Sequence, residues 1–156
     1  MYSEDFQKKL HNWLPNYLEK HQIDFKNEII RVFDICCFPW QGAVELSFLT
    51  TNEPNFNETE YGKYSVADWR LYSFNYEILK DWEESKNLFF EMRELWEGSQ
   101  EFRDISGELF TACAQVAMST EIKEALSKYE LTGDFEITVF DPDDHEKVNY
   151  CKSVNK

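Results

Sequence analysis

Two apolar segments on either side of a short turn dominate the pattern of hydrophobic and polar positions. The segments are Ile29 to Phe38 and Ala43 to Leu49, and Pro39-Trp40-Gln41-Gly42 lies between them. Proline fixes φ and glycine permits φ > 0, so this pattern predicts a β-hairpin. In the second segment Glu45 and Ser47 alternate with apolar residues, which predicts a strand with one buried and one partly wet face.

The first of these segments is apolar on both of its faces. Ile30 and Val32 fall on one face of an ideal strand together with Cys36, whereas Phe33 and Ile35 fall on the other. Strands that are buried on both sides have near-continuous apolar sequences. We therefore expect this strand to be central in a sheet and to be covered by another layer on each side.

Apolar residues with helical spacing precede and follow the hairpin. One stripe predicts an amphipathic helix over 3–22, in which Pro15 either causes a kink or begins a second short helix. Further stripes predict helices over 78–97, 102–118 and 120–130. We expect Gly98 to follow the end of the first of these three, and Ser119 to cap the start of the last.

Two more segments have the alternation that is typical of strands. Residues 69–75, which follow a polar loop at 52–63, predict a third strand, and residues 134–140 predict a last strand. We expect Gly133 to end the preceding helix in the left-handed conformation. The sequence therefore predicts an α+β fold, with an N-terminal helix, a C-terminal helical pair or trio, and a mainly antiparallel sheet of about four strands, at 28–38, 43–51, 69–75 and 134–140.

Length and composition predict one globular domain over 1–156, in which residues 143–156 form a polar, frayed tail. The chain has 156 residues, and 42% of them are hydrophobic, which is enough to bury a core. The sequence contains no run of about 18 apolar residues and no apolar signal-peptide core. We therefore expect a cytoplasmic protein that does not contact membranes.

The charge of the chain limits its partners. Thirty acidic residues against 16 basic ones give a net charge of −14, and most of this excess lies after residue 40. A field of this sign repels nucleic acids and anionic membranes and accelerates association with a basic surface. Solubility alone is an equally good explanation of such a charge.

Known chemical motifs are missing from the sequence. The acidic turn from Asp141 to Glu146 lacks the glycine and the final glutamate of a calcium-binding EF-hand loop, because Glu146 and Lys152 occupy those positions. Phosphate-binding loops, nucleophile elbows and zinc-protease motifs do not occur either. The four cysteines lack metal-type spacing, and we interpret them as buried, reduced thiols. We predict no catalytic residue, cofactor or metal, although a cryptic carboxylate or cysteine site stays open.

A contact surface for another protein is the remaining candidate site. Acidic side chains accelerate encounter, and tyrosine is enriched at the centres of interfaces. An ordinary solvated helix face and core packing of the tyrosines are the alternative interpretations. The residues that we assign to this candidate surface come from the 53–61 loop, the aromatic segment after it and the 83–97 helix: Glu58, Glu60, Tyr61, Tyr64, Tyr72, Glu84, Glu91 and Glu94.

Four sequence segments resemble a family of small bacterial proteins of unknown function. They are FPWQGAVELSFLT, ADWRLYSF, FTACAQVAMSTEIKEAL and DFEITVFDPDD, and the resemblance loosely covers the chain from about Glu28 to Asp144. Gene neighbourhoods imply that members of such families are immunity proteins of polymorphic or contact-dependent toxin systems. The resemblance implies no catalytic residue.

The acidity agrees with this resemblance, because many such toxins are basic nucleases. The first hypothesis is therefore an acidic cytosolic protein that neutralises a bacterial toxin by occlusion. An enzyme with a cryptic site and a regulatory interaction domain are the alternatives.

Overall fold

The computed structural model describes residues 3–53 and 63–154 and has an α+β fold. Its sheet has the strand order β2-β1-β3, in which β1 (Ile29–Phe38) is antiparallel to β2 (Ala43–Thr50) and parallel to β3 (Glu130–Thr138). The α+β prediction is confirmed. The predicted number of about four strands and the mainly antiparallel order are wrong, because the sheet is mixed and has three strands in the described residues.

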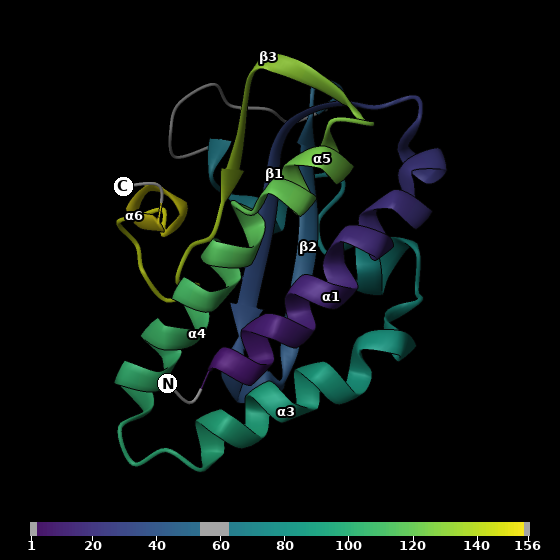
Figure 1. Ribbon diagram of the computed structural model, residues 1–156. Helices are drawn as coiled ribbons and strands as arrows, with labels where there is room; N and C mark the ends of the chain where they lie inside the picture. Colours follow the sequence, from purple (N-terminus) through teal and green to yellow (C-terminus); the bar gives the residue numbers. More distant parts are fainter. Residues whose placement is uncertain (1–2, 54–62, 155–156) are drawn as a thin grey trace.

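Helices cover one face of this sheet (Figure 1). The helices α1 (Glu4–Lys20), α3 (Lys86–Glu97), α4 (Phe102–Ala117) and α5 (Thr120–Leu126) pack there, and a short α6 (Cys151–Val154) follows near the end of the chain. The helical segments between β2 and β3 return the chain to the starting end of β1, so that β3 runs parallel to β1. In the described part of the chain, no helix has the length and apolar character that crossing a membrane requires.

The hairpin is confirmed, and Gly42 is essential to its turn. Pro39–Gln41 form one 3₁₀ turn, and Gly42 follows it with φ of 63°. A side chain at this position would be strained by that φ, and its Cβ would also lie 3.1 Å from Arg93 Cβ and 3.2 Å from the Phe89 carbonyl oxygen. The turn therefore lies directly against α3.

A β-bulge changes the faces of β1 that the ideal alternation predicts. Ile30 pairs with Thr50 but Val32 pairs with Leu49, so Arg31 is an extra residue in the ladder. A bulge of this kind moves the following side chains to the opposite face. As a result, Ile30 lies in the main core, and Val32 lies in a small second cluster with Leu49 and Trp69 on the other side of the sheet.

The predicted strand at 69–75 is wrong because side chains replace its backbone hydrogen bonds. Leu71 makes a single bridge to Phe48, and a π-helical turn, Phe74–Ile78, follows directly. The Asn75 side chain accepts a hydrogen bond from Leu46 N and donates one to the Val44 carbonyl, both at 2.9 Å. The edge of β2 is thus satisfied without a third antiparallel strand.

The last strand begins at Glu130, four residues before the predicted start at 134. Leu131 pairs with Ile30 and Glu136 pairs with Val32, so residues 132–135 arch away from β1. Gly133 lies within this arch and does not have a positive φ, so the prediction that it ends a helix in the left-handed conformation is wrong.

The helix ends agree with the sequence signals in most places. Ser119 caps α5, because its hydroxyl accepts a hydrogen bond from Ile122 N, and Gly98 follows α3. The first helix is continuous through Pro15, so the alternative of a second short helix is wrong. The helix predicted from residue 78 begins only at Lys86, because a 3₁₀ turn, Trp82–Ser85, precedes it.

The end of the chain packs against β3. The Asn149 side chain accepts a hydrogen bond from Val139 N at 3.0 Å and donates one to the Ile137 carbonyl at 3.1 Å. Cys151 is 2% exposed and belongs to the main core. These contacts join residues 149–151 to the sheet, and the fraying of 143–156 stays a prediction.

Candidate functional site

A groove of about 860 Å³ lies between the hairpin turn, the ends of α3 and α4 and the turn after β3. We call it the acidic groove. Five aromatic residues and four aspartates come together in it from separate parts of the chain, with one arginine among them. The residues that line the acidic groove are Trp40, Trp96, Phe102, Arg103, Asp104, Ser106, Gly107, Phe110, Asp141, Asp143, Asp144 and Tyr150.

Stacked rings form the aromatic wall of the acidic groove. Trp96 and Phe102 stack with centroids 4.5 Å apart, and the Trp96 indole N–H donates to the Ser106 hydroxyl at 3.1 Å, which fixes its orientation. Phe102 is nevertheless 47% exposed. Phe110 and Tyr150 meet edge to face at 5.6 Å. An ordered aromatic surface left open to solvent is a common property of interface centres.

Two of the four aspartates of the acidic groove are held by backbone hydrogen bonds. The Asp141 carboxylate accepts from Asp143 N at 2.9 Å, and the Asp144 carboxylate accepts from the backbone N–H groups of Glu146 and Val148. These bonds fix the turn without neutralising its charge.

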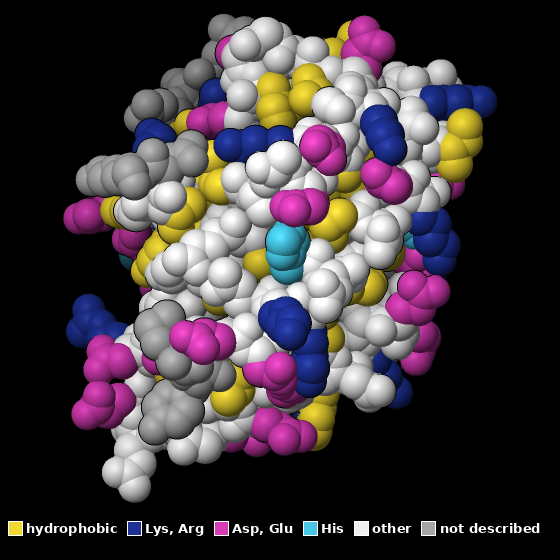
Figure 2. All heavy atoms as spheres, in the orientation of Figure 1, with side chains coloured by type: hydrophobic (Ala, Val, Ile, Leu, Met, Phe, Trp, Pro, Cys, Tyr) yellow, Lys and Arg dark blue, Asp and Glu magenta, His cyan; other side chains and the backbone are white. Residues whose placement is uncertain are grey.

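The acidic groove has a net negative charge that no described residue neutralises. Within residues 3–53 and 63–154, none of its four aspartates forms an ion pair with Lys, Arg or His. A hydrogen bond with the Asp104 side chain, and then the negative charge of that carboxylate, raise the pKa of Glu101. Four aspartates against one arginine give the lining an excess of three negative charges. The surface around it is also acidic, because acidic side chains follow α3 and the start of α4 (Figure 2).

Gly107 opens the floor of the acidic groove. It lies inside α4, and a Cβ atom built on it meets no other atom within 4 Å. Glycine inside a helix costs about 0.5–1 kcal/mol relative to alanine. The helix therefore carries a locally unfavourable residue at a place where a larger side chain would project into the groove.

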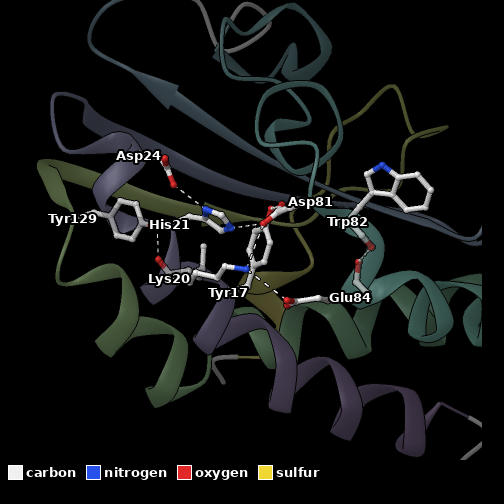
Figure 3. A network of polar contacts seen from close by, with 10 residues as sticks. Tyr17, Lys20, His21, Asp24, Asp81, Trp82, Glu84 and Tyr129 are labelled. Atoms are coloured by element: carbon white, nitrogen blue, oxygen red, sulfur yellow. Dashed lines mark hydrogen bonds and ion pairs between the residues drawn. The ribbon is translucent and has the colours of Figure 1, made fainter.

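A second group of carboxylates, at the end of α1, is paired with other side chains of the fold (Figure 3). We call it the His21 cluster. His21 lies between Asp24, at 2.8 Å, and Asp81, and the Tyr17 hydroxyl donates to Asp81 at 2.6 Å. The two ring nitrogens of His21 therefore contact carboxylates from two separate segments of the chain. Lys20 adds a cation 3.9 Å from Asp81. The His21 cluster thus joins the end of α1 to the segment before α3.

One carboxyl is buried in the sheet itself. Asp34 is 1% exposed, and among the described residues its hydrogen-bond donor is the Thr138 hydroxyl, at 2.6 Å. Burial raises the pKa of Asp34 to about 7, more than the hydrogen bond from Thr138 lowers it. Asp34 also lines a cavity of about 430 Å³ on the sheet face opposite the helices, together with Tyr72, His145 and Lys147.

The predicted tyrosines lie on the sheet face opposite α3. The Tyr64 hydroxyl donates to Glu136 at 2.7 Å, and its ring meets Phe140 edge to face. The Tyr72 hydroxyl donates to both oxygens of Glu45, at 2.8 and 2.9 Å. Both hydroxyl groups are therefore used within the fold.

The predicted acids of the 83–97 helix lie on the other side of the molecule. Glu84 pairs with Lys20 at 3.5 Å and Glu91 with Lys9 at 2.7 Å, whereas Glu94 is exposed. The structure thus does not bring these acids together with Tyr64 and Tyr72. Glu58, Glu60 and Tyr61 lie outside the described residues.

The acidic groove is a site that the sequence pattern did not single out. The sequence from Asp141 to Glu146 indicates no EF-hand loop, and Trp96 belongs to the apolar stripe of the predicted 78–97 helix. The available signals are Trp40 in the hairpin turn, Trp96 near the end of α3 and Phe102 at the start of α4, because large aromatic residues at turns and helix ends often remain partly exposed. Their meeting with residues 141–144 depends on tertiary structure.

Metal and thiol chemistry receive no support from the described residues. Within residues 3–53 and 63–154, no three His, Cys, Asp or Glu side chains are grouped to hold a metal ion. Burial raises the pKa of the Cys36 and Cys37 thiols, and that of Cys151 to about 12. These thiols are therefore neutral at pH 7 and are poor nucleophiles.

No protein-family model, curated protein or solved structure matches the chain.

Proposed function

We propose that this protein is a binding protein that engages a basic protein partner through the acidic groove. One observation carries the proposal: ordered, partly exposed aromatic rings and four unpaired aspartates line the same groove. Arginine and lysine side chains fit both features, since their charges pair with carboxylates and their cationic groups stack on aromatic faces.

The two features have different kinetic roles in this proposal. The net charge of −14 and the unpaired aspartates attract a basic surface over distance and accelerate encounter. The aromatic wall around Trp96 and Phe102 provides apolar contact area that slows dissociation. A rival contact surface would use the acids predicted from the sequence, Glu84, Glu91 and Glu94, which lie on the opposite side of the sheet from the predicted tyrosines.

The specific form that we propose is a cytoplasmic immunity protein that neutralises a bacterial toxin by occlusion. Support comes from the sequence resemblance and from the charge, which suits a basic nuclease domain as partner. Occlusion requires a rigid complementary surface and no catalytic group in the inhibitor. The acidic groove meets this requirement, because backbone hydrogen bonds and ring stacking fix its walls.

Peptide binding tests the proposal for the groove itself. The probe is a short arginine-rich peptide, compared with its citrulline counterpart of the same shape, and binding is followed by tryptophan fluorescence, because Trp40 and Trp96 line the groove. We expect salt-sensitive binding of the arginine peptide and none of the citrulline peptide. Equal binding of both peptides would overturn the electrostatic part of the proposal.

Substitution at Gly107 locates the binding site. Gly107→Lys places a cation in the groove, and Gly107→Ala is the matched control that adds only a methyl group. Both replacements favour the helix over glycine, so neither should unfold α4. We expect Gly107→Lys to weaken peptide binding at least about tenfold, since a like charge now occupies the site, and Gly107→Ala to bind almost as the native chain does. Unchanged binding by Gly107→Lys would place the contact elsewhere.

The immunity form has a separate test. Co-expression with the toxic domain of a large secreted protein that is encoded next to this gene should protect the host cell, and Gly107→Lys should abolish the protection while Gly107→Ala keeps it. Peptide binding in the groove without protection from such a toxin would leave a binding protein and overturn the immunity role.

A further inference from the structure

A second groove, beside the arch in β3, is lined mostly by apolar side chains. It lies between α5, β3 and α6, with a cavity volume of about 440 Å³. We call it the apolar groove. Residues 132–135 leave the ladder with β1, and Leu131 and Phe135 at this arch line the groove. Its walls are Met118, Leu126, Leu131, Phe135, Ile137 and Cys151. Hydrophobic side chains are visible between β3 and α5 in the space-filling view (Figure 2).

Most polar groups in the apolar groove are already used by the fold. Glu136 accepts a hydrogen bond from the Tyr64 hydroxyl at 2.7 Å and pairs with Lys63 at 3.0 Å. The Ser127 hydroxyl donates to the Glu124 carbonyl at 2.6 Å. The Asn149 side chain is bonded to the backbone of β3. None of these groups needs a ligand to complete its hydrogen bonds.

Two lysines at the edge of the apolar groove, unlike these polar groups, have no ion-pair partner among the described residues. Lys123 on α5 and Lys152 on α6 are exposed, and neither forms an ion pair within the described ranges, 3–53 and 63–154. The Lys123 charge acts on the Cys151 thiol, which places this charge close to the cavity. Burial outweighs that charge and raises the pKa of Cys151 to about 12, so the thiol remains a neutral part of the apolar wall.

The geometry points to a binding site for a small amphiphile with an acyl chain and an anionic head group, of which a fatty-acid carboxylate is the simplest form. The chain would bury apolar surface along β3, and the carboxylate would pair with Lys123 and Lys152. Pockets of 300 to 1,000 Å³ with apolar walls and a few charged groups are typical of small-molecule sites. A chain with net charge −14 repels anions elsewhere, so two unpaired lysines beside an apolar cavity are a selective feature.

Calorimetric titration with dodecanoate, kept below its micellar concentration, tests the site. We expect one saturable site per chain, and binding about fourfold tighter for each further methylene that is buried along the series from octanoate to dodecanoate. Dodecyltrimethylammonium has the same chain length and a cationic head, and we expect it to bind at least about tenfold more weakly. No saturable binding of dodecanoate, or equal affinity for the cationic amphiphile, would overturn the proposal.

Matched double variants separate the head-group contact from general charge. Lys123→Gln with Lys152→Gln removes the two groove cations, and Lys8→Gln with Lys26→Gln removes two exposed lysines elsewhere. All four positions are exposed, so both variants should keep the native melting temperature. We expect about tenfold weaker dodecanoate binding and a smaller salt dependence for the groove variant alone. The same loss in both variants, or in neither, would contradict the assigned contact.

Discussion

The His21 cluster and the acidic groove both gather carboxylates, but only the carboxylates of the cluster are paired with His, Lys or Tyr side chains. In the cluster, Asp24 and Asp81 face His21, the Tyr17 hydroxyl and Lys20. In the acidic groove, four aspartates have no ion-pair partner among the residues that the structure describes. The comparison distinguishes charge that stabilises the fold from charge that remains available to a partner.

The stability cost of losing a carboxylate should therefore differ between the two places. A partly buried carboxylate with several donors contributes through charge-assisted hydrogen bonds, and its removal leaves the donors unsatisfied. An exposed carboxylate among like charges contributes almost nothing to folding. The buried Asp34 is a third case, because burial penalises the charged form of its carboxyl.

The largest effect on stability should come from Asp34, as a dependence of the free energy of unfolding on pH. Because the folded-state pKa is about 7 and the ordinary value is 3.8, the folded chain binds the proton more tightly than the unfolded chain. Stability from this group is present at low pH and is lost as the pH rises from about 4 through 7, by at most about 4 kcal/mol.

Asp34→Asn should remove this loss. We expect the variant to be more stable than the native chain at pH 8 and equal to it near pH 4, because the amide carbonyl still accepts from Thr138. Chemical denaturation at both pH values measures the difference. A variant that is less stable than the native chain at pH 8 would mean that the ionised carboxylate is favourable in the fold.

Removing one carboxylate from each site should give different losses in the free energy of unfolding. Asp81→Ala should lower the free energy of unfolding by about 2 kcal/mol, because His21 and the Tyr17 hydroxyl lose their shared acceptor. Asp143→Ala in the acidic groove should change it by less than about 0.5 kcal/mol. Urea denaturation of the two variants makes the comparison, and equal losses would remove the distinction between them.

Substitution of Gly107 should change the free energy of unfolding by a smaller amount, and should raise it. Gly107→Ala should raise the free energy of unfolding by about 0.5–1 kcal/mol, because a helix-interior glycine is replaced and nothing lies within 4 Å of the new methyl group. Thermal melting measures this gain. A loss of stability would indicate that the floor of the groove is closed in solution.

Local signals in the sequence predicted a large part of this fold. Gly42 and Pro39 located the hairpin turn, Ser119 located the start of α5, and Gly98 located the end of α3. Each of these residues acts through its own backbone or a neighbouring one, so no knowledge of tertiary contacts is needed. Strand alternation also predicted the buried face of β2, on which Leu46 and Phe48 are fully buried, but Ser47 on the face predicted to be partly wet is buried as well.

Features that depend on distant residues did not follow from the sequence. The extra residue at Arg31 changed the faces of β1, and the Asn75 side chain took the place of a predicted strand at the edge of β2. Neither the extra residue nor the Asn75 contact produces a periodic pattern of apolar residues in the sequence. The acidic groove could not be predicted from the sequence for the same reason. Trp40, Phe102 and Asp143 are far apart in the sequence and meet only in the folded chain.

Two double variants with the same charge change test the central claim most directly. Asp104→Asn with Asp143→Asn and Glu84→Gln with Glu94→Gln each change the net charge from −14 to about −12. The measurement is the affinity of the arginine-rich peptide at two salt concentrations. We expect the groove variant to bind about tenfold more weakly with a smaller salt dependence, and the variant at Glu84 and Glu94 to bind almost as the native chain does. The opposite result, with binding lost only in the variant at Glu84 and Glu94, would contradict the assignment of the acidic groove.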